Sequence, residues 1–265
     1  MNSTELNQKI NLLKFFICKM CFIAKSGHPS SSLSCADIIG MLYFDIMNHG
    51  IDKFMLSKGH AAPSLYAALM VKGDISEDLI GKLRKIDSPL QGHTDVNRLP
   101  QVNLTTGALG QGLSFSIGAA LSKKIKKENG YIYSLIGDGE VQEGQIWEAA
   151  MFAGNYKLDN LITFLDNNGG QSDGSVDEIF PIDPIEDKFK AFGWSTEIVN
   201  GHDISEIKHK IENFKNSKIK KPLMIISKTK KGYINKNLSI LNGSHSGLID
   251  EHVFDLVKTE LKVDK

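Results

Sequence analysis

Residues 131–140 have the sequence Tyr131-Ile132-Tyr133-Ser134-Leu135-Ile136-Gly137-Asp138-Gly139-Glu140, which indicates a buried strand that ends in a glycine-rich loop. Residues 131–136 are mostly apolar and do not alternate with charged residues, which is typical of a strand buried on both faces. Glycines at the carboxyl end of such a strand let the backbone approach a phosphate. The acidic Asp138 is expected there if a hard divalent cation bridges its carboxylate and the phosphate oxygens.

The next apolar run, 160–165, is followed by Asp166-Asn167-Asn168-Gly169-Gly170. Successive strands of a βαβ unit lie close together, so Asp138 and Asn168 are expected to converge on one ion. Their side-chain oxygens, a backbone carbonyl assigned to Gly170, two diphosphate oxygens and a water would complete the octahedron that Mg²⁺ prefers. Ca²⁺ or Mn²⁺ would suit similar ligands. Each motif alone also fits an ordinary turn, whereas both together favour the cation site.

The pattern on either side of these motifs predicts a doubly wound α/β domain with a mainly parallel sheet and helices on both faces. Further strands are expected at 195–199 and 222–227. No linker is evident, so we expect residues 1–265 to form a single diphosphate- and magnesium-binding domain. Residues 230–247 are expected to form a surface loop. The expected helices span 5–25, 34–47 (with Ser34 as N-cap), 63–72, 76–86, 109–128, 143–156, 185–192, 203–216 and 248–262.

Composition excludes several classes of protein. The 31 basic and 31 acidic residues give a formal net charge of zero, which argues against a nucleic-acid partner. No apolar stretch is long enough to span a bilayer, and no signal peptide is expected. Cys18 and Cys21 form a C-x-x-C without a second pair, which favours inert core thiols over redox or metal chemistry. A reducing, cytoplasmic setting is the expectation.

The chain resembles the amino-terminal part of transketolase, in the form in which the enzyme is split into two polypeptides. Several blocks carry this resemblance, in one order. They are Ser26-Gly27-His28-Pro29, Leu56-Ser57-Lys58-Gly59-His60-Ala61, Gln91-Gly92-His93, Thr105-Thr106-Gly107-Ala108-Leu109-Gly110-Gln111-Gly112, Gly137-Asp138-Gly139-Glu140-Val141-Gln142-Glu143-Gly144 and Asp166-Asn167-Asn168 through Asp173-Gly174.

The resemblance implies a thiamine diphosphate enzyme that transfers a two-carbon ketol unit from a ketose, expected to be a phosphate, to an aldose. The implied catalytic residues are His28, His60, His93 and His245. Histidine suits this chemistry because it moves protons near neutral pH. The implied cofactor-binding residues are His60, Gly107, Leu109, Gly137, Asp138, Gly139, Glu140 and Asn168.

The resemblance also implies a partner. The glutamate that faces the aminopyrimidine ring lies, in the family, on a following domain that this sequence does not contain. A second chain with the pyrimidine-binding and carboxy-terminal domains would supply it, in a closed assembly of two copies of each chain. Glu143 matches an acidic residue at the family's subunit interface, although a glutamate in a first helical turn also stabilises the helix dipole.

The sequence departs from the family pattern in two places. Ser30 and Ser31 replace the usual glycines, and Ser244-His245-Ser246 replaces Trp-His-Gly. An enzyme that makes an unusual sugar is therefore an alternative to the ordinary pentose phosphate reaction. A component of a 2-oxo-acid dehydrogenase, a deoxyxylulose-phosphate synthase fragment and a non-catalytic cofactor-binding chain are further alternatives.

Overall fold

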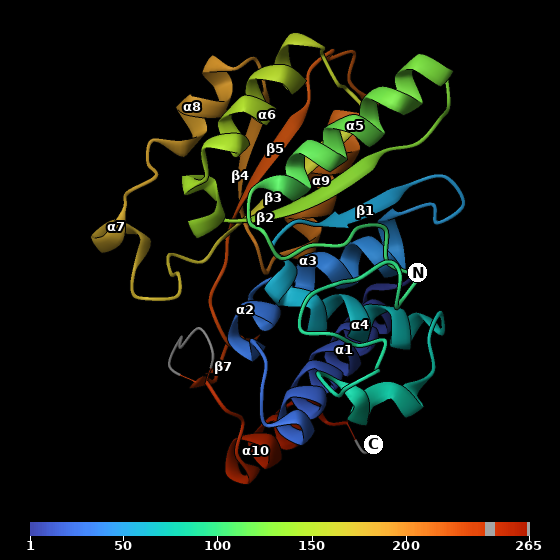
Figure 1. Cartoon of the computed structure of the whole chain (residues 1–265), viewed down its shortest axis with the longest axis vertical. Coiled ribbons are helices and arrows are strands. Elements are labelled where there is room, and N and C mark those ends of the chain that lie inside the picture. The colour runs from blue at the N-terminus through green and yellow to red at the C-terminus, as the bar shows by residue number, and fades with distance from the viewer. Residues whose placement is uncertain (242–246, 264–265) are drawn as a thin grey trace. The chain divides into compact units, whose positions relative to one another are not determined.

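A computed structural model describes residues 1–241 and 247–263 of the chain (Figure 1). Its backbone contacts divide it into two compact units. Asn48–Lys58 and Ala108–Thr229 form one of them, called here the sheet unit. The other, called here the helical unit, comprises Met1–Met47, Gly59–Gly107 and Lys230–Lys265.

The sheet unit is built on a five-stranded sheet in the order β1-β2-β3-β5-β4, in which every pairing is parallel. This confirms the predicted α/β fold. Strands β2, β3 and β5 are the apolar runs that the sequence predicts, and their side chains are almost all buried. The strands are β1 (Lys53–Leu56), β2 (Ile132–Gly137), β3 (Leu161–Asn167), β4 (Ser195–Asn200) and β5 (Leu223–Lys228).

Helices connect these strands on both faces of the sheet. The chain steps in one direction from β1 to β2 to β3, and right-handed crossovers then place α5 and α6 on the same face. The step from β4 back to β5 reverses direction and places α9 on the opposite face, as Figure 1 shows. The helical segments of this unit are α5 (Gln111–Lys126), the 3₁₀ turn η4 (Gly139–Gln142), α6 (Gly144–Asn155), α7 (Val176–Ile179), α8 (Ile185–Ala191) and α9 (Ile204–Asn216).

The helical unit is organised around α1 (Ser3–Ala24), which packs against α3, α4 and α10. Its apolar residues recur at helical spacing and are buried, as predicted: Leu6, Ile10, Leu13, Ile17 and Met20. The other elements are α2 (Pro29–Ser34), α3 (Ala36–Met41), the π-helical turn η1 (Leu42–Ile46), the 3₁₀ turns η2 (Gly59–Ala61) and η3 (Glu77–Lys82), α4 (Ala62–Lys72), the strands β6 (Tyr233–Asn235) and β7 (Leu238–Ser239), and α10 (Glu251–Leu261).

Several local predictions are wrong. Ser34 is not an N-cap but the last residue of α2, and its hydroxyl donates to the Ser31 carbonyl at 3.0 Å. The helix starts earlier because Pro29, with its fixed φ, occupies the first turn. The helix expected at 76–86 is only a 3₁₀ segment. Part of the loop expected at 230–247 forms the antiparallel pair β6–β7, and β1 was not predicted because it has only four residues.

No helix within the described residues is both long enough and apolar enough to cross a bilayer.

Candidate active site

Strands β2 and β3 are neighbours, and their carboxyl ends are level. Gly137, the last residue of β2, pairs in register with Asp166 near the end of β3. Asp138 follows the first strand directly and Asn168 follows the second. The two loops therefore lie together, as predicted for successive strands of a βαβ unit.

Asp138 is almost fully buried and receives backbone donors from both loops. Its Oδ1 accepts the N–H of Gly139 at 2.9 Å, and its Oδ2 accepts the N–H of Gly169 at 2.6 Å. Burial, followed by the neighbouring Asp166 carboxylate, raises the pKa of Asp138 to about 6, although Lys58 and the two N–H donors act in the opposite direction. Burial makes the ionised form of this carboxyl unfavourable, so a cation bound beside it would stabilise the charge.

Asn168 is held between an acceptor and a donor. Its Nδ2 donates to Asp166 Oδ2 at 3.2 Å, and its Oδ1 accepts the N–H of Gly170 at 3.1 Å. With the Asp138 carboxylate, this amide oxygen makes an all-oxygen set, which suits a hard cation. Among the described residues, no group of three His, Cys, Asp or Glu side chains is placed to hold a metal. A cation here would therefore need backbone and ligand oxygens as well, as the sequence predicts.

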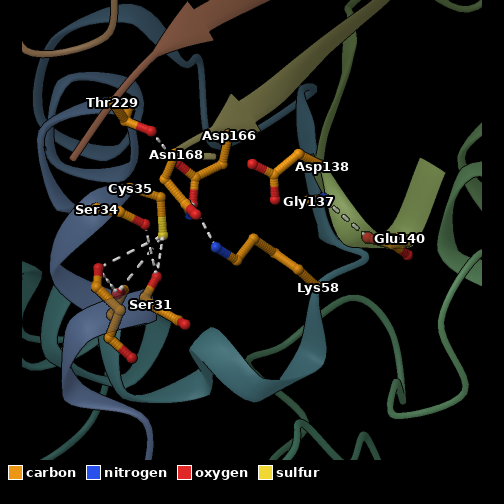
Figure 2. Close-up of polar contacts among 12 residues, drawn as sticks. Ser31, Ser34, Cys35, Lys58, Gly137, Asp138, Glu140, Asp166, Asn168 and Thr229 are labelled. Carbon is orange, nitrogen blue, oxygen red and sulfur yellow. Dashed lines mark hydrogen bonds and ion pairs between the residues drawn. The ribbon is translucent and has the colours of Figure 1, made fainter. Parts of the chain in front are cut away.

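Three residues at this site were missed by sequence reasoning. Lys58 is 1% exposed and forms an ion pair with Asp166, which is 0% exposed (Figure 2). The Thr229 hydroxyl donates to the other oxygen of the same carboxylate. The signal was a charged residue next to an apolar run, since Lys58 follows β1 and Asp166 lies inside β3. An isolated charge in such a run needs a partner.

Glu140 supports the loop that follows β2. Its Oε1 accepts the Ser57 hydroxyl at 2.5 Å and the Gly110 N–H at 2.8 Å, while its Oε2 accepts the Gly137 N–H at 3.0 Å. The side chain is 2% exposed, and burial raises the pKa of its carboxyl. Both oxygens therefore bind groups of the chain itself and hold the loop in place.

The amino end of α5 lies against the strand end that carries Lys58. A Cβ added to Gly112 would lie 2.6 Å from the Ser57 Cα, so only glycine fits this approach. The Leu109 carbonyl accepts from Gln145 Nε2 at 2.9 Å. Glu143 is exposed and occupies the N-cap position of α6 without a side-chain capping bond.

Three of the predicted histidines form a cluster in the helical unit. The ring centroids of His28 and His60 are 5.5 Å apart, and those of His28 and His93 are 6.4 Å apart. Burial, followed by the charge of Arg84, lowers the pKa of His93. The loop that carries His93 is positioned by the Tyr66 hydroxyl, which lies 3.2 Å from the His93 carbonyl. All three rings are half-buried and suited to proton transfer.

Two remaining predictions concern the edges of the site. Gly107 lies beside the His93 ring, with 3.7 Å between a built Cβ and the ring. His245 lies outside the described residues.

Cys18 and Cys21, the C-x-x-C pair, lie on the buried face of α1. Burial raises the pKa of Cys18, and it raises the pKa of Cys21 to about 12, because a thiolate loses its hydration there.

The chain matches the family described as "Transketolase, thiamine diphosphate binding domain" over residues 6–265. The "6-deoxy-6-sulfo-D-fructose transketolase subunit SqwG" of Clostridium sp. (strain MSTE9) is 42% identical over 247 residues, covering 89% of this chain and 88% of that protein. An apulose-4-phosphate transketolase subunit of Phocaeicola vulgatus is 38% identical, covering 86% of this chain and 82% of that protein.

Solved structures show the same likeness in three dimensions. The transketolase of Campylobacter jejuni is 32% identical with a TM-score of 0.90, and the match covers 100% of this chain and 44% of that one. The chain therefore belongs to the transketolase family and corresponds to its thiamine diphosphate-binding domain. It is the thiamine diphosphate-binding subunit of a transketolase, a transferase of two-carbon ketol units. Membership of this family does not favour the rival thiamine enzymes.

Proposed function

We propose that this subunit supplies the diphosphate and metal half of a divided active site, and that it is active only with a partner chain. The observation that carries the proposal is the pair of aligned strand ends, where Asp138 Oδ2 binds the N–H of the residue after Asn168. The partner would carry the pyrimidine-binding and carboxy-terminal domains, in an assembly of two copies of each chain, while residues 1–265 act as a single functional domain.

Asp138, Asn168 and the Gly170 carbonyl would hold a divalent cation, Mg²⁺ in the first instance and Ca²⁺ or Mn²⁺ as substitutes. Their oxygen chemistry supports this assignment. When bound, thiamine diphosphate supplies an electron sink for the carbanion formed by ketose cleavage. The cofactor contacts would come from His60, Gly107, Leu109, Gly137, Gly139 and Glu140, and Glu143 would lie at the subunit interface.

The histidines would handle the substrate's protons. Breaking the ketose C2–C3 bond removes a proton from one hydroxyl, and the aldose carbonyl oxygen later gains one. Its lowered pKa favours the neutral form of His93, which suits proton acceptance. His28 and His60 would orient donor and acceptor hydroxyls, and His245 would join them from the carboxy-terminal segment.

The donor would be a ketose with an anionic end. An ordinary pentose phosphate reaction in the cytoplasm is the first candidate. A specific observation favours a second one, because the two subunit-type relatives are named for 6-deoxy-6-sulfo-D-fructose and apulose-4-phosphate. The changed residues Ser30 and Ser31 are both buried in α2, where the family has glycines.

The test is a ketol-transfer assay with thiamine diphosphate, Mg²⁺ and a panel of ketoses that includes phosphates and 6-deoxy-6-sulfo-D-fructose. The chain is assayed alone and co-purified with the candidate partner encoded beside its gene. We expect turnover only in the mixture, and loss of turnover in Asp138→Ala. Equal cofactor affinity with and without the partner would refute the divided site.

A further inference from the structure

We propose that Asp166 is a positioning residue, which Lys58 and Thr229 hold in place so that Asn168 presents its amide oxygen to the bound cation. This inference rests on the proposed function and assigns a role to three residues outside the expected ligand set. All of them belong to the sheet unit.

The Asp166 carboxylate is a shared acceptor for side chains from three loops. Lys58 follows β1, Asn168 follows β3 and Thr229 follows β5. Each of these side chains donates to Asp166, Lys58 and Asn168 to Oδ2 and Thr229 to Oδ1. Figure 2 shows Lys58, Asn168 and Thr229 directed toward Asp166, with Asp138 beside them. An ionised carboxylate has about four acceptor sites on its two oxygens, so it can bind all of these donors.

This arrangement decides which end of the Asn168 amide faces where. The two ends of an amide have nearly the same shape but opposite hydrogen-bonding character. Only one orientation satisfies both neighbours, because Asp166 requires the NH₂ end while the Gly170 N–H requires the oxygen. The reversed amide would set donor against donor and would present N–H groups to a cation.

Lys58 also determines the charge of the site. It is almost fully buried, so its positive charge offsets the Asp166 carboxylate directly behind the proposed ligands. A buried carboxylate without this partner would compete with Asp138 for the cation, and its negative charge would repel the Asp138 carboxylate. The ion pair therefore leaves Asp138 as the carboxylate offered to the metal, together with the amide of Asn168.

The chain offers a matched control for this role. Lys14 and Asp37 form a second buried lysine–aspartate pair in the helical unit, with 2.8 Å between Lys14 Nζ and Asp37 Oδ1 and side-chain exposures of 4% and 6%. Lys14→Met and Lys58→Met remove the same kind of charge from the same degree of burial. A general loss of stability would affect both variants, whereas a positioning role belongs to Lys58.

The test measures Mn²⁺ binding by electron paramagnetic resonance, with thiamine diphosphate present, on the full chain co-purified with its partner. We expect Asp166→Asn and Lys58→Met to lower Mn²⁺ affinity by about 10- to 100-fold, as for other residues that orient metal ligands. Thr229→Val should lower it less, and Thr229→Ser should restore it because the hydroxyl returns. Lys14→Met should bind Mn²⁺ like the wild type.

The outcomes separate the two proposals. If the wild type binds no Mn²⁺ or is indifferent to Asp138→Ala, the proposed metal site itself is wrong. If Asp138→Ala abolishes binding but Thr229→Val and Asp166→Asn retain wild-type affinity, the positioning role is wrong. Thr229→Val nearly conserves the volume of a side chain that lies in a loop, so this variant is expected to fold. It therefore tests the inference even if Lys58→Met does not fold.

Discussion

The two buried lysine–aspartate pairs of this protein use the same chemistry in opposite ways. In the helical unit the lysine is the shared group: Lys14 Nζ binds Asp37, donates to the Ile234 carbonyl at 2.9 Å and lies 4.7 Å from the centre of the Tyr233 ring. In the sheet unit the aspartate is the shared group, and Asp166 accepts from Lys58, Thr229 and Asn168.

The two pairs are therefore suited to different roles. A shared donor such as Lys14 ties backbone and side chains of α1, α3 and β6 together, and its effect is on stability. A shared acceptor such as Asp166 orients the side chains that donate to it, one of which is a proposed metal ligand. The direction of the hydrogen bonds, rather than burial or charge, distinguishes the two.

The largest expected effect comes from breaking either pair. Lys14→Met and Lys58→Met should each lower the free energy of unfolding by about 3–5 kcal/mol, because an aspartate is left buried without its counter-charge. Urea denaturation of the metal-free chain measures both. A small loss in either variant would mean that the remaining aspartate finds another partner.

Replacing both members of a pair sharpens the contrast. Lys14→Met with Asp37→Leu should recover most of the lost stability, since a buried ion pair can often be exchanged for apolar residues. Lys58→Met with Asp166→Leu should recover less, because Thr229 and Asn168 lose their acceptor at about 1–3 kcal/mol each. Equal recovery at the two positions would remove the distinction between them.

The pH dependence of stability tests the raised pKa of Asp138. The pKa of Asp138 is raised to about 6 in the folded chain, so between its ordinary value and 6 the folded state binds more protons than the unfolded state. Unfolding free energy should therefore fall as pH rises through this window, by on the order of 2–3 kcal/mol for a shift of about two units. The loss is complete once the pH has passed the folded-state pKa.

The difference in urea midpoint between wild type and Asp138→Asn, followed from about pH 4 to pH 7, isolates this group from Glu140. Mg²⁺ with thiamine diphosphate should stabilise the wild type more at neutral pH than at about pH 5, because the ligand must be ionised. A flat difference profile would show that Asp138 titrates normally.

A smaller loss of stability is expected from a substitution that displaces the backbone near Lys58 without changing any charge. Gly112→Ala would push on Ser57, next to Lys58, and should destabilise the chain by about 1–3 kcal/mol through overpacking. Gly118→Ala is the control, because Gly118 is exposed in the same helix with nothing within 4 Å of its built Cβ. That variant should be stabilised by roughly 0.5–1 kcal/mol. Thermal unfolding of both variants provides the comparison.

The smallest effect belongs to an exposed ion pair. Lys124 Nζ lies 2.7 Å from Asp159 Oδ1, with side-chain exposures of 34% and 19%. Lys124→Met should change the free energy of unfolding by at most about 1 kcal/mol, since water already solvates both charges. A loss as large as that of Lys58→Met would show that burial does not explain the strength of the two buried pairs.

Much of this protein was predictable from local pattern. The apolar runs at 131–136 and 160–165 become buried strands, and the loops at their carboxyl ends lie together, because Asp138 accepts the N–H of Gly169, the residue after Asn168. The three spaced histidines also gather in one cluster. The strands and loops follow from sequence because hydrophobic periodicity and turn residues act over short distances. The histidine cluster was expected only from the resemblance to transketolase.

Helix boundaries near Ser34 and the short strand β1 were not predicted. In the first case proline shifted the start of the helix, and in the second four residues carry too little pattern. Such boundaries depend on the competition between neighbouring turns, which a periodic pattern does not resolve.

The strand-loop motifs, the family resemblance and the residues expected to meet a diphosphate and a cation were all evident from the order of the amino acids. The convergence of Lys58 and Thr229 on Asp166 was evident only in the folded chain. These residues are separated from Asp166 by 108 and 63 positions. They meet because the carboxyl ends of β1, β3 and β5 lie on the same side of one parallel sheet. Strand order depends on contacts between distant parts of the chain, so the pairing of Lys58 with Asp166 could not be predicted from local sequence patterns.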